Sequence, residues 1–430
     1  MTMRSKRLTG AALCVAASLT LAACGGGDDT AEPETETATE SESAAPAAEG
    51  DGTLTIGSLL PQTGNLAFLG PPEFAGVELA IKEINEAGGV LDQEVAYVEG
   101  DAGDTSQDIA NPTVDRLLAA NVDVIIGAAS SGVSLTVIDK ITSAGVVQYS
   151  PANTAAELTD YEDNGLYFRT APPDILQGRI LGETILADGC ANLGVLALQD
   201  PYGEGLANFV GETVTGGGSA LAPEEPIFYD PAASNFDAQV NELKAANPDC
   251  VALIGFEESA KVINSMVSAG IGPQEVPLYL VDGNLGNALG EDLPAGVLAG
   301  AKGSLPGAEA TAEFRERLAT VDPALKDYSY AAESYDAVIT SALAALVAES
   351  DSGEAIGAEL SGVTKDGEKC TTFADCKELI EAGDDIDYDG ISGPIELNEK
   401  GDPTSAIIGI YTYGPDNKLT TDVQYQQGEV

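Results

Sequence analysis

The chain has 430 residues but no histidine and no tryptophan, and its 19 basic residues stand against 70 acidic ones. Without histidine, Ser-His-Asp and Cys-His catalysis, a histidine general base and histidine-ligated metal sites are all excluded. The formal net charge of −51 opposes binding to nucleic acid, to anionic lipid and to acidic substrates. The acidic residues are scattered as well as clustered, which indicates a solvated and salt-adapted surface more than a specific cation-binding role.

Motifs for nucleotide binding and nucleophilic catalysis are missing as well. No Gly-Lys-Ser/Thr phosphate loop occurs, and Gly203-Glu204-Gly205 lacks the third glycine of a dinucleotide fingerprint. Ser130 stands in an Ala-Ala-Ser-Ser-Gly sequence, which is not a nucleophile elbow. We therefore expect a protein that is not an enzyme and that carries no cofactor and no metal.

The N-terminus predicts secretion and lipid anchoring. Three basic residues precede a mostly apolar stretch at residues 8–21, which is too short to span a bilayer and fits a signal peptide over residues 1–23. The stretch ends in Leu-Ala-Ala-Cys followed by glycines, which resembles a bacterial lipobox with Cys24 as the lipid-modified residue. An ordinary signal peptide with a chance cysteine is the alternative. We expect an extracytoplasmic protein anchored to the cell membrane through Cys24.

Residues 24–52 hold the anchor cysteine and an acidic tether of Gly, Glu, Thr, Ser, Ala and Pro with no aromatic or basic residue. Such a segment buries too little apolar surface to offset its ordering entropy, so we expect it to be disordered. No later segment is long and apolar enough to cross a membrane. The mature chain is therefore predicted to be anchored to the membrane without spanning it.

Four cysteines remain in the mature chain, an even number in an oxidising compartment. Cys190 precedes a predicted strand at residues 193–199, and Cys250 opens another at residues 251–255. If these strands are neighbours, Cys190 and Cys250 can form a disulfide, and Cys370–Cys376 would close a small local loop. Four cysteines allow three pairings, so the sequence alone leaves the choice open.

From residue 53 onward, short apolar runs alternate with helical stretches, which indicates βαβ units and parallel sheets covered on both faces. A second series of the same kind begins near residue 175. About 380 ordered residues exceed one ordinary domain, so we predict an α/β protein with two doubly wound parallel-sheet lobes. The predicted strands are residues 54–60, 94–99, 124–127, 147–150, 193–199, 226–229, 251–255 and 278–281, and the predicted helices are residues 72–87, 108–120, 133–144, 175–187, 205–213, 236–246 and 259–269.

Ligands of open parallel sheets bind beyond the carboxyl ends of the strands, so the loops there are candidate binding sites. The loop after residues 124–127 is rich in serine and runs into a helix, and the loop after residues 147–150 reads Pro-Ala-Asn-Thr. Hydroxyls and free N–H groups at a helix N-terminus can bind a carboxylate. Simple N-capping by Ser131 and Thr154 is the alternative. Two such loops at consecutive strand ends favour a ligand site.

The chain resembles the branched-chain amino-acid (Leu/Ile/Val) substrate-binding proteins of ABC importers, which belong to the type I periplasmic-binding-protein family. The resemblance covers nearly all of residues 53–415 in order and implies a ligand cleft between two hinged lobes. It is carried by residues 56–64, 76–80, 84–90, 125–134, 149–159, 168–170 with Asp174 and residues 177–178, 200–205, 334–337, and 388–394 with residues 401–402.

The resemblance also implies roles for individual residues. Ser131 would bind the ligand α-carboxylate, the Ala152 carbonyl would bind the α-ammonium, and Thr154 would contact both. Tyr202 would reach in from the second lobe. Asp282 matches an acidic residue that pairs with the ammonium, although a Glu is usual there and the spacing departs by one residue.

The apolar wall is implied less sharply by the same resemblance. Leu69 stands where the family often has an aromatic residue, and Phe68 and Phe256 are nearby candidates. An aliphatic side chain at position 69 suggests a changed pocket volume. Burial of an aliphatic ligand side chain on cleft closure would contribute about 0.8 kcal/mol per CH₂.

One further stretch of the sequence matches a known motif closely. Asp385, Asp387, Asp389, Gly390 and Glu396 satisfy the spacing of an EF-hand calcium loop. Against calcium, Pro394 lies inside the loop, the following segment is predicted as loop and strand, and the resembling family has an ordinary turn here. We favour the turn and predict no metal.

The sequence thus predicts an extracytoplasmic, monomeric binding protein that passes a small amino acid, with a branched chain favoured, to an ABC permease. Lobe 1 is predicted to comprise residues 53–172 and 307–403, and lobe 2 residues 173–306 and 404–430, with three crossovers; two continuous lobes split near residue 172 are the weaker alternative. Alternatives for function are a ligand sensor that signals through a membrane partner, an importer component for amides, urea-like molecules or aromatic acids, and, least favoured, an enzyme.

Overall fold

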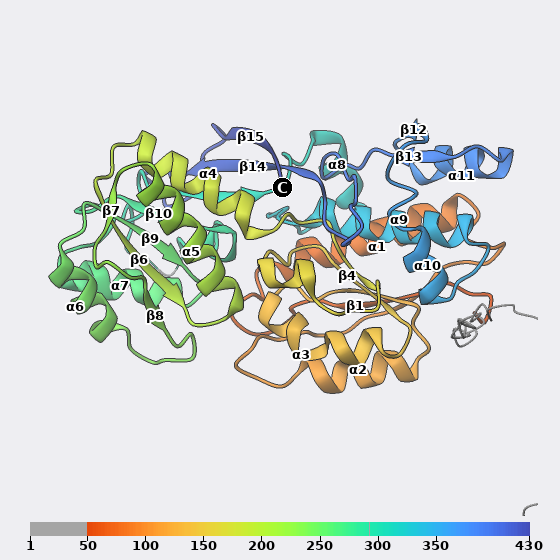
Figure 1. The fold of residues 1–430 in the computed structure, drawn as a ribbon, viewed down its shortest axis with the longest axis horizontal. Coiled ribbons are helices and arrows are strands. Elements are labelled where there is room, and N and C mark those ends of the chain that lie inside the picture. The colour runs from red at the N-terminus through yellow and green to blue at the C-terminus, as the bar shows by residue number, and fades with distance from the viewer. Residues whose placement is uncertain (1–49, 292) are drawn as a thin grey trace, which may run out of the picture. The chain divides into compact units, whose positions relative to one another are not determined.

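The computed structural model describes residues 50–291 and 293–430. The predicted signal peptide, the lipid-anchor residue Cys24 and most of the predicted tether lie outside the described residues. Within the described part of the chain, no helix has the length and apolarity needed to cross a bilayer. The secondary structure alternates between strands and helices through most of the chain, as the sequence predicts (Figure 1).

The first sheet contains five parallel strands, and short apolar runs form it because both of its faces are covered. Alternate residues of one strand enter different cores: Val124 and Ile126 pack in one hydrophobic cluster, and Ile125 packs in another. Helices α1 (Gly70–Glu86) and α9 (Ala331–Val347) contribute to the first cluster, and α2 (Ala110–Ala119) and α3 (Ser131–Thr142) to the second. In spatial order the strands are β2 (Ala96–Val98), β1 (Thr55–Leu59), β3 (Val124–Gly127), β4 (Val147–Ser150) and β5 (Tyr167–Arg169).

The second sheet has eight strands and is mixed. Its interior strands are parallel, whereas β14 (Ser405–Thr412) runs antiparallel to β11 (Lys302–Pro306), and β15 (Gln424–Glu429) runs antiparallel to β14. The other strands are β10 (Leu278–Leu280), β9 (Cys250–Ile254), β6 (Asn192–Leu198), β7 (Ala220–Leu221) and β8 (Ile227–Tyr229). Helices α4 (Asp174–Ala187), α5 (Pro201–Gly216), α6 (Asp237–Ala246) and α7 (Ser259–Ala269) connect and cover them.

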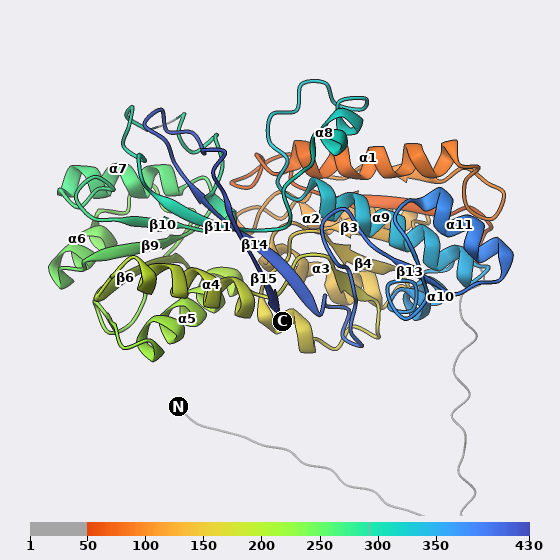
Figure 2. The same cartoon turned by 90° about the horizontal axis from the view of Figure 1, so that it is seen from above.

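The described chain passes between the two sheets three times, after β5, after β11 and before β14. Figure 2 shows β11 and β14 side by side where they join the two parts of the molecule. After β11 the chain forms α8 (Ala312–Leu318), and α9 then packs against α1. The elements before β14 are α10 (Gly353–Glu359), β12 (Glu368–Cys370), α11 (Phe373–Ala382) and β13 (Ile386–Tyr388).

Both predicted disulfides are present. Cys190 and Cys250 are bonded with their Cα atoms 5.9 Å apart, and β6 and β9 are indeed neighbours. Cys370 and Cys376 are bonded with their Cα atoms 5.3 Å apart. The first links two parallel strands across a separation of 60 residues, so it limits the freedom of the unfolded chain far more than the local one does.

The segment with calcium-loop spacing is not an EF-hand. Strand β13 covers Ile386–Tyr388, so the aspartates do not wrap around a common centre. The Lys369 ammonium lies 2.9 Å from carboxylate oxygens of both Asp387 and Asp389 and serves as their counter-ion. No cluster of three or more Asp, Glu, His or Cys side chains arranged for a metal ion occurs in residues 50–291 and 293–430.

Ser131 and Thr154 do not cap helices, which was the alternative to a role in ligand binding. Helix α3 begins at Ser131, and its N-cap is Ser130, whose hydroxyl accepts a hydrogen bond from the Val133 N–H at 3.4 Å. Thr154 caps no helix, because the short 3₁₀ helix η1 (Ala156–Asp160) begins after Ala155 without a side-chain cap. Both Ser131 and Thr154 are thereby free of the structural role that was the alternative to ligand binding.

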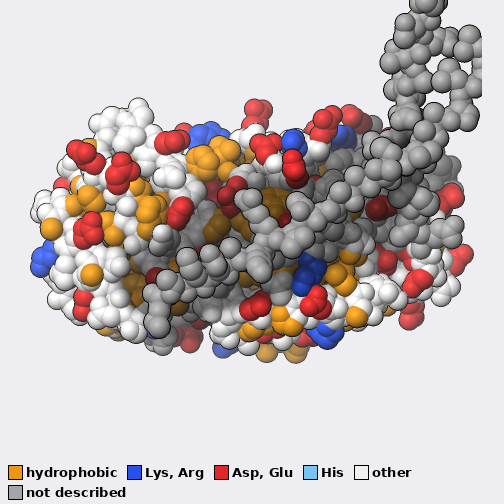
Figure 3. Space-filling view, turned by 60° about the horizontal axis from the view of Figure 1, so that its bottom comes forward, with side chains coloured by type: hydrophobic (Ala, Val, Ile, Leu, Met, Phe, Trp, Pro, Cys, Tyr) orange, Lys and Arg blue, Asp and Glu red, His pale blue; other side chains and the backbone are white. Residues whose placement is uncertain are grey.

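Acidic side chains predominate over basic ones on the face of the molecule drawn in Figure 3. Figure 3 shows acidic side chains spread over the visible face among few basic ones. This distribution agrees with the interpretation of the acidic residues as a solvated surface.

Candidate ligand-binding site

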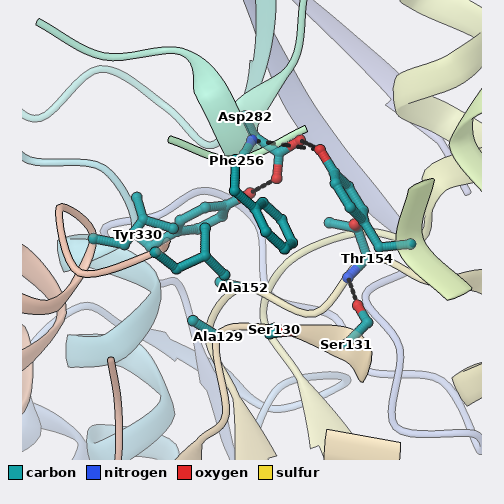
Figure 4. A pocket seen from close by; sticks show the side chains of 12 residues that line it. Ala129, Ser130, Ser131, Ala152, Thr154, Phe256, Asp282 and Tyr330 are labelled. Atoms are coloured by element: carbon teal, nitrogen blue, oxygen red, sulfur yellow. Dashed lines mark hydrogen bonds between the residues drawn. The ribbon is translucent and has the colours of Figure 1, made fainter. Parts of the chain in front are cut away.

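A small pocket lies where strand ends from the two sheets meet, and it spans about 270 Å³, a volume that includes solvent at its mouth. The loops that build it follow the carboxyl ends of β1, β3, β4, β6, β9 and β10, as expected for parallel sheets. All seven residues predicted to bind ligand line this one pocket (Figure 4). The lining residues are Leu66, Leu69, Ala129, Ser130, Ser131, Ala152, Thr154, Tyr202, Phe256, Asp282, Gly283 and Tyr330.

Ser131 and Thr154 bring the two loops of the first sheet together. The Ser131 hydroxyl oxygen accepts hydrogen bonds from the backbone N–H groups of Thr154 and Ala155, both at 3.2 Å. Its own hydrogen is therefore available to donate to a ligand oxygen. The Thr154 hydroxyl is buried and has no hydrogen-bond partner among the described residues. A buried hydroxyl without a partner is costly, so a ligand group that satisfies it gains that free energy on binding.

The Pro-Ala-Asn-Thr loop is held by a rigid polar frame. Asn153 donates to the carbonyls of Ala128 and Ala129 at 3.0 and 2.9 Å. The Arg169 guanidinium donates to the carbonyls of Asn153 and Ala155 at 3.3 and 2.9 Å. Its charge is balanced by Asp402, at 2.6 Å in a fully buried ion pair. These contacts fix the loop so that the Ala152 carbonyl, which accepts no hydrogen bond from the described residues, is left for a ligand donor.

Asp282 stands on the opposite side of the pocket and belongs to the second sheet. Its carboxylate accepts hydrogen bonds from the Gln177 amide at 2.7 Å, the Tyr202 hydroxyl at 2.8 Å and the Tyr330 hydroxyl at 2.8 Å. A carboxylate offers about four acceptor directions, so one remains for a ligand N–H. Burial raises the pKa of Asp282, and the three hydrogen bonds oppose that rise.

A second buried carboxyl group interacts electrostatically with Asp282. Asp174, the first residue of α4, is fully buried, and neither of its oxygens makes a hydrogen bond to a described residue. Burial, together with the charge of Asp282, raises the pKa of Asp174 well above its ordinary value, and the nearby Thr154 side chain opposes that rise. Among the described residues that line the pocket, none is basic. A cationic ligand group is therefore the natural counter-ion here.

The remaining wall of the pocket is apolar. The rings of Tyr202 and Phe256 stack with centroids 5.6 Å apart and planes 10° from parallel. Leu66, Leu69 and Phe256 line the pocket and are each nearly fully buried. Phe68, the third predicted wall candidate, does not line this pocket but a neighbouring one with Asn284 and Leu289.

The two sides of the pocket touch. The Glu257 N–H donates to the Asn65 carbonyl at 3.1 Å, which joins the loop after β9 to the loop after β1. Tyr330, at the start of α9, reaches Asp282 across the pocket (Figure 4). Loops that follow strands of both sheets are thus in direct contact beside the pocket.

Sequence reasoning missed Tyr330, Asp174, Gln177, Ser130 and Leu66. Asp174 and Gln177 lie in a segment that resembles the family, and their spacing of three residues places them on one helix face. Tyr330 had no such signal. It adopts a left-handed backbone conformation, with φ of 59°, in a turn whose position depends on the packing of α9 against α1.

The comparisons with known proteins agree with this geometry. Residues 53–378 match the family model described as periplasmic binding protein. The chain is 28% identical to the Leu/Ile/Val-binding protein homolog 1 of Brucella abortus over 84% of this chain and 91% of that protein. It is 24% identical to the chemotactic signal transduction system substrate-binding protein BasB of Halobacterium salinarum, over 83% of this chain and 86% of that protein.

A solved structure shares the fold. The substrate-binding protein LivJ of the branched-chain amino acid transporter from Streptococcus pneumoniae, in complex with isoleucine, superposes with a TM-score of 0.71 at 20% identity. The alignment covers 87% of this chain and all of that one. Because the family model matches most of the chain, the protein belongs to the periplasmic binding protein family, whose members bind solutes outside the cytoplasm.

Proposed function

We propose that the protein captures a zwitterionic amino acid with a small aliphatic side chain and delivers it to an ABC import permease. The observation that carries the proposal is the polarity of the pocket. Hydroxyl donors of Ser131 and Thr154 lie on one side, and the Asp282 carboxylate, backed by Asp174, lies on the other. An α-carboxylate needs donors and an α-ammonium needs acceptors, so this arrangement matches both ends of an amino acid head group.

The proposed roles follow from the contacts. The free hydrogen of Ser131 and the unpartnered Thr154 hydroxyl donate to the ligand carboxylate. The Ala152 carbonyl and the Asp282 carboxylate accept from the ammonium. Tyr202 orients Asp282 and covers the head group with its ring. Leu69 and Phe256 contact the aliphatic side chain, whose burial contributes about 0.8 kcal/mol per CH₂.

The charge of the pocket separates this ligand class from the alternatives. An aromatic acid without an ammonium would place its carboxylate near two buried aspartates and gain no basic partner from the lining residues. Amides and urea-like molecules could use the same hydroxyls and carbonyl, but they would leave Asp282 without a cationic partner. The cost of a buried, unpaired charge therefore favours amino acids.

Thermal-shift measurements on the domain without its N-terminal segment test this proposal. L-leucine, L-isoleucine and L-valine are expected to raise the unfolding temperature, whereas benzoate, acetamide and urea are not. Ser131→Ala is expected to abolish the shift, and Ser143→Ala, at the exposed end of α3, should preserve it. Equal shifts with benzoate and leucine would refute the assigned ligand class.

The remaining features of the proposal concern location and movement. We propose that Cys24 carries the lipid anchor and that the protein acts as a monomer. We further propose that two rigid lobes move relative to each other, one made of residues 53–172 and 307–403 and the other of residues 173–306 and 404–430. Mass spectrometry of the membrane-bound protein, before and after a Cys24→Ser change, tests the anchor.

A second function is favoured by one observation, the similarity to the substrate-binding protein BasB of a chemotactic signalling system. A sensor and an importer component can use the same ligand cleft, so the pocket does not distinguish them. Uptake of labelled leucine by cells with and without the gene distinguishes them. Unchanged uptake together with a lost behavioural response to leucine would establish sensing in place of transport.

A further inference from the structure

A second cavity, distinct from the ligand pocket, is also lined by Tyr330 and spans about 970 Å³, a volume that includes solvent at its open mouth. Tyr330 lines both cavities, with its hydroxyl directed to Asp282. The other walls come from the segment before α9 and from strands β14 and β15, including Tyr328, Tyr411 and Tyr425. Because four tyrosines line it, we call it the tyrosine cavity. It joins elements of both sheets.

One acid in this cavity lacks a counter-ion. Glu333 lines the cavity, its side chain is only 4% exposed, and it makes no side-chain hydrogen bond or ion pair with another described residue. Its carboxyl lies so close to Gly307 that a Cβ atom at that position would clash with Oε1. Glu73 nearby is also buried, and both of its oxygens are without partners. Buried carboxyls of this kind are costly unless a cation or a proton neutralises them.

The basic side chains of the cavity do not serve this purpose. Arg315 lies 3.3 Å from Glu309 and sits over the Tyr328 ring, 5.0 Å from its centroid. Lys326 is exposed and forms no ion pair within the described part of the chain. Two aromatic rings also line the cavity. The rings of Tyr411 and Tyr425 meet edge to face with centroids 6.4 Å apart, and their hydroxyls lie 3.3 Å apart. Aromatic faces attract cations, and quaternary ammonium groups in particular.

We propose that the tyrosine cavity binds a small organic cation, a primary or quaternary ammonium, with Glu333 as its counter-ion and the rings of Tyr411 and Tyr425 as its walls. A metal ion fits less well, because it would require several converging oxygen ligands. The proposal is independent of the ligand assigned to the pocket at Asp282, since Glu333 and the two rings do not line that pocket.

The protonation state of Glu333 leads to a measurable prediction, the release of a proton on binding. Burial, and then the charge of Asp336, raises the pKa of Glu333 to about 8. The other titratable groups that interact with Glu333 are Glu73, Tyr330 and Tyr411. At pH 7 the Glu333 carboxyl is therefore mostly protonated, and an arriving cation favours its ionised form. Binding should release a proton, and the affinity should rise from pH 6 to pH 8.

Isothermal titration with tetramethylammonium chloride, compared with sodium chloride at equal ionic strength, tests the proposal. We expect saturable binding of tetramethylammonium alone, and proton release detected as different heats in buffers of different ionisation enthalpy. Glu333→Gln should weaken binding at least about tenfold, as loss of a charged partner predicts. Tyr425→Ala, at a residue that is 37% exposed, should weaken it several-fold and provides a test even if the first variant fails to fold.

Thermal unfolding without ligand serves as the control for the fold of each variant. Asp384→Asn, which removes an exposed acid on the surface, should leave tetramethylammonium binding unchanged and controls for general attraction to an acidic protein. Equal heats with the two salts, or equal affinity in Tyr425→Ala, Glu333→Gln and the unmodified protein, would overturn the proposal.

Discussion

Replacement of Asp282 by asparagine gives the sharpest test of the ligand pocket. Three donors converge on the carboxylate, the Gln177 amide at 2.7 Å and the hydroxyls of Tyr202 and Tyr330 at 2.8 Å each. Asparagine has nearly the same shape but carries no charge and presents one oxygen and one NH₂ group. At least one of the three donors would therefore face another donor.

The magnitude follows from these contacts. Loss of a hydrogen bond between a charged ammonium and a carboxylate costs about 1.5–3 kcal/mol. The three protein donors to Asp282 are affected with and without ligand, so only the lost ammonium bond enters the affinity. It predicts a rise of about tenfold to a hundredfold in the dissociation constant for L-leucine, since 1.4 kcal/mol corresponds to about tenfold.

Isothermal titration calorimetry with L-leucine measures this change directly. Asp384→Asn provides a matched control, because it makes the same chemical change at an exposed site. Thermal unfolding without ligand verifies that Asp282→Asn folds. If the folded variant binds leucine within about threefold of the unmodified protein, Asp282 is not the partner of the ammonium and the reasoning fails.

Three further predictions concern the frame of the pocket and the buried acids. Tyr330→Phe removes one hydrogen bond to Asp282. Titration with leucine should therefore show a loss of about 0.5–1.5 kcal/mol in binding free energy. An unchanged affinity would show that Tyr330 does not contribute to ligand binding. Arg169→Met leaves Asp402 as a buried charge without its partner, so urea unfolding should show a loss of about 3–5 kcal/mol in unfolding free energy; a loss below 1 kcal/mol would contradict the framing role. Burial raises the pKa of Asp200 to about 7 and that of Glu333 to about 8. Each acid therefore stabilises the folded state while the pH lies below the ordinary pKa of the group. This contribution to stability is lost as the pH rises through the raised pKa of the folded state. The unfolding temperature should therefore fall between pH 5 and pH 8, and a rise over this range would be inconsistent with buried, neutral acids.

The sequence predicts the order of the first elements well, and it predicts their bounds where local signals mark both ends of an element. Strands β3 and β4 and helix α7 match their predicted bounds closely because apolar runs and small-residue loops mark both ends. Strands β11, β14 and β15 were not predicted as individual elements. Strand β14 pairs with β11, which lies about a hundred residues earlier in the chain, and no local pattern encodes such a partner.

The site shows the same division between local and distant information. Ser131, Thr154, Tyr202 and Asp282 follow strand ends, so their positions are fixed by the parallel-sheet pattern and by the family resemblance. Tyr330 enters the pocket only because α9 packs on α1 and turns its first residues toward the second sheet. The buried state of Asp174 likewise depends on tertiary packing.

The central claim is that the head group of an amino acid lies between the Ser131–Thr154 loops and Asp282. A crystal structure of the protein soaked with L-leucine tests this claim most directly. We predict density for leucine with its carboxylate within hydrogen-bond distance of the Ser131 and Thr154 hydroxyls and its ammonium beside Asp282. An empty pocket at saturating leucine, or a ligand bound with its carboxylate toward Asp282, would contradict the account.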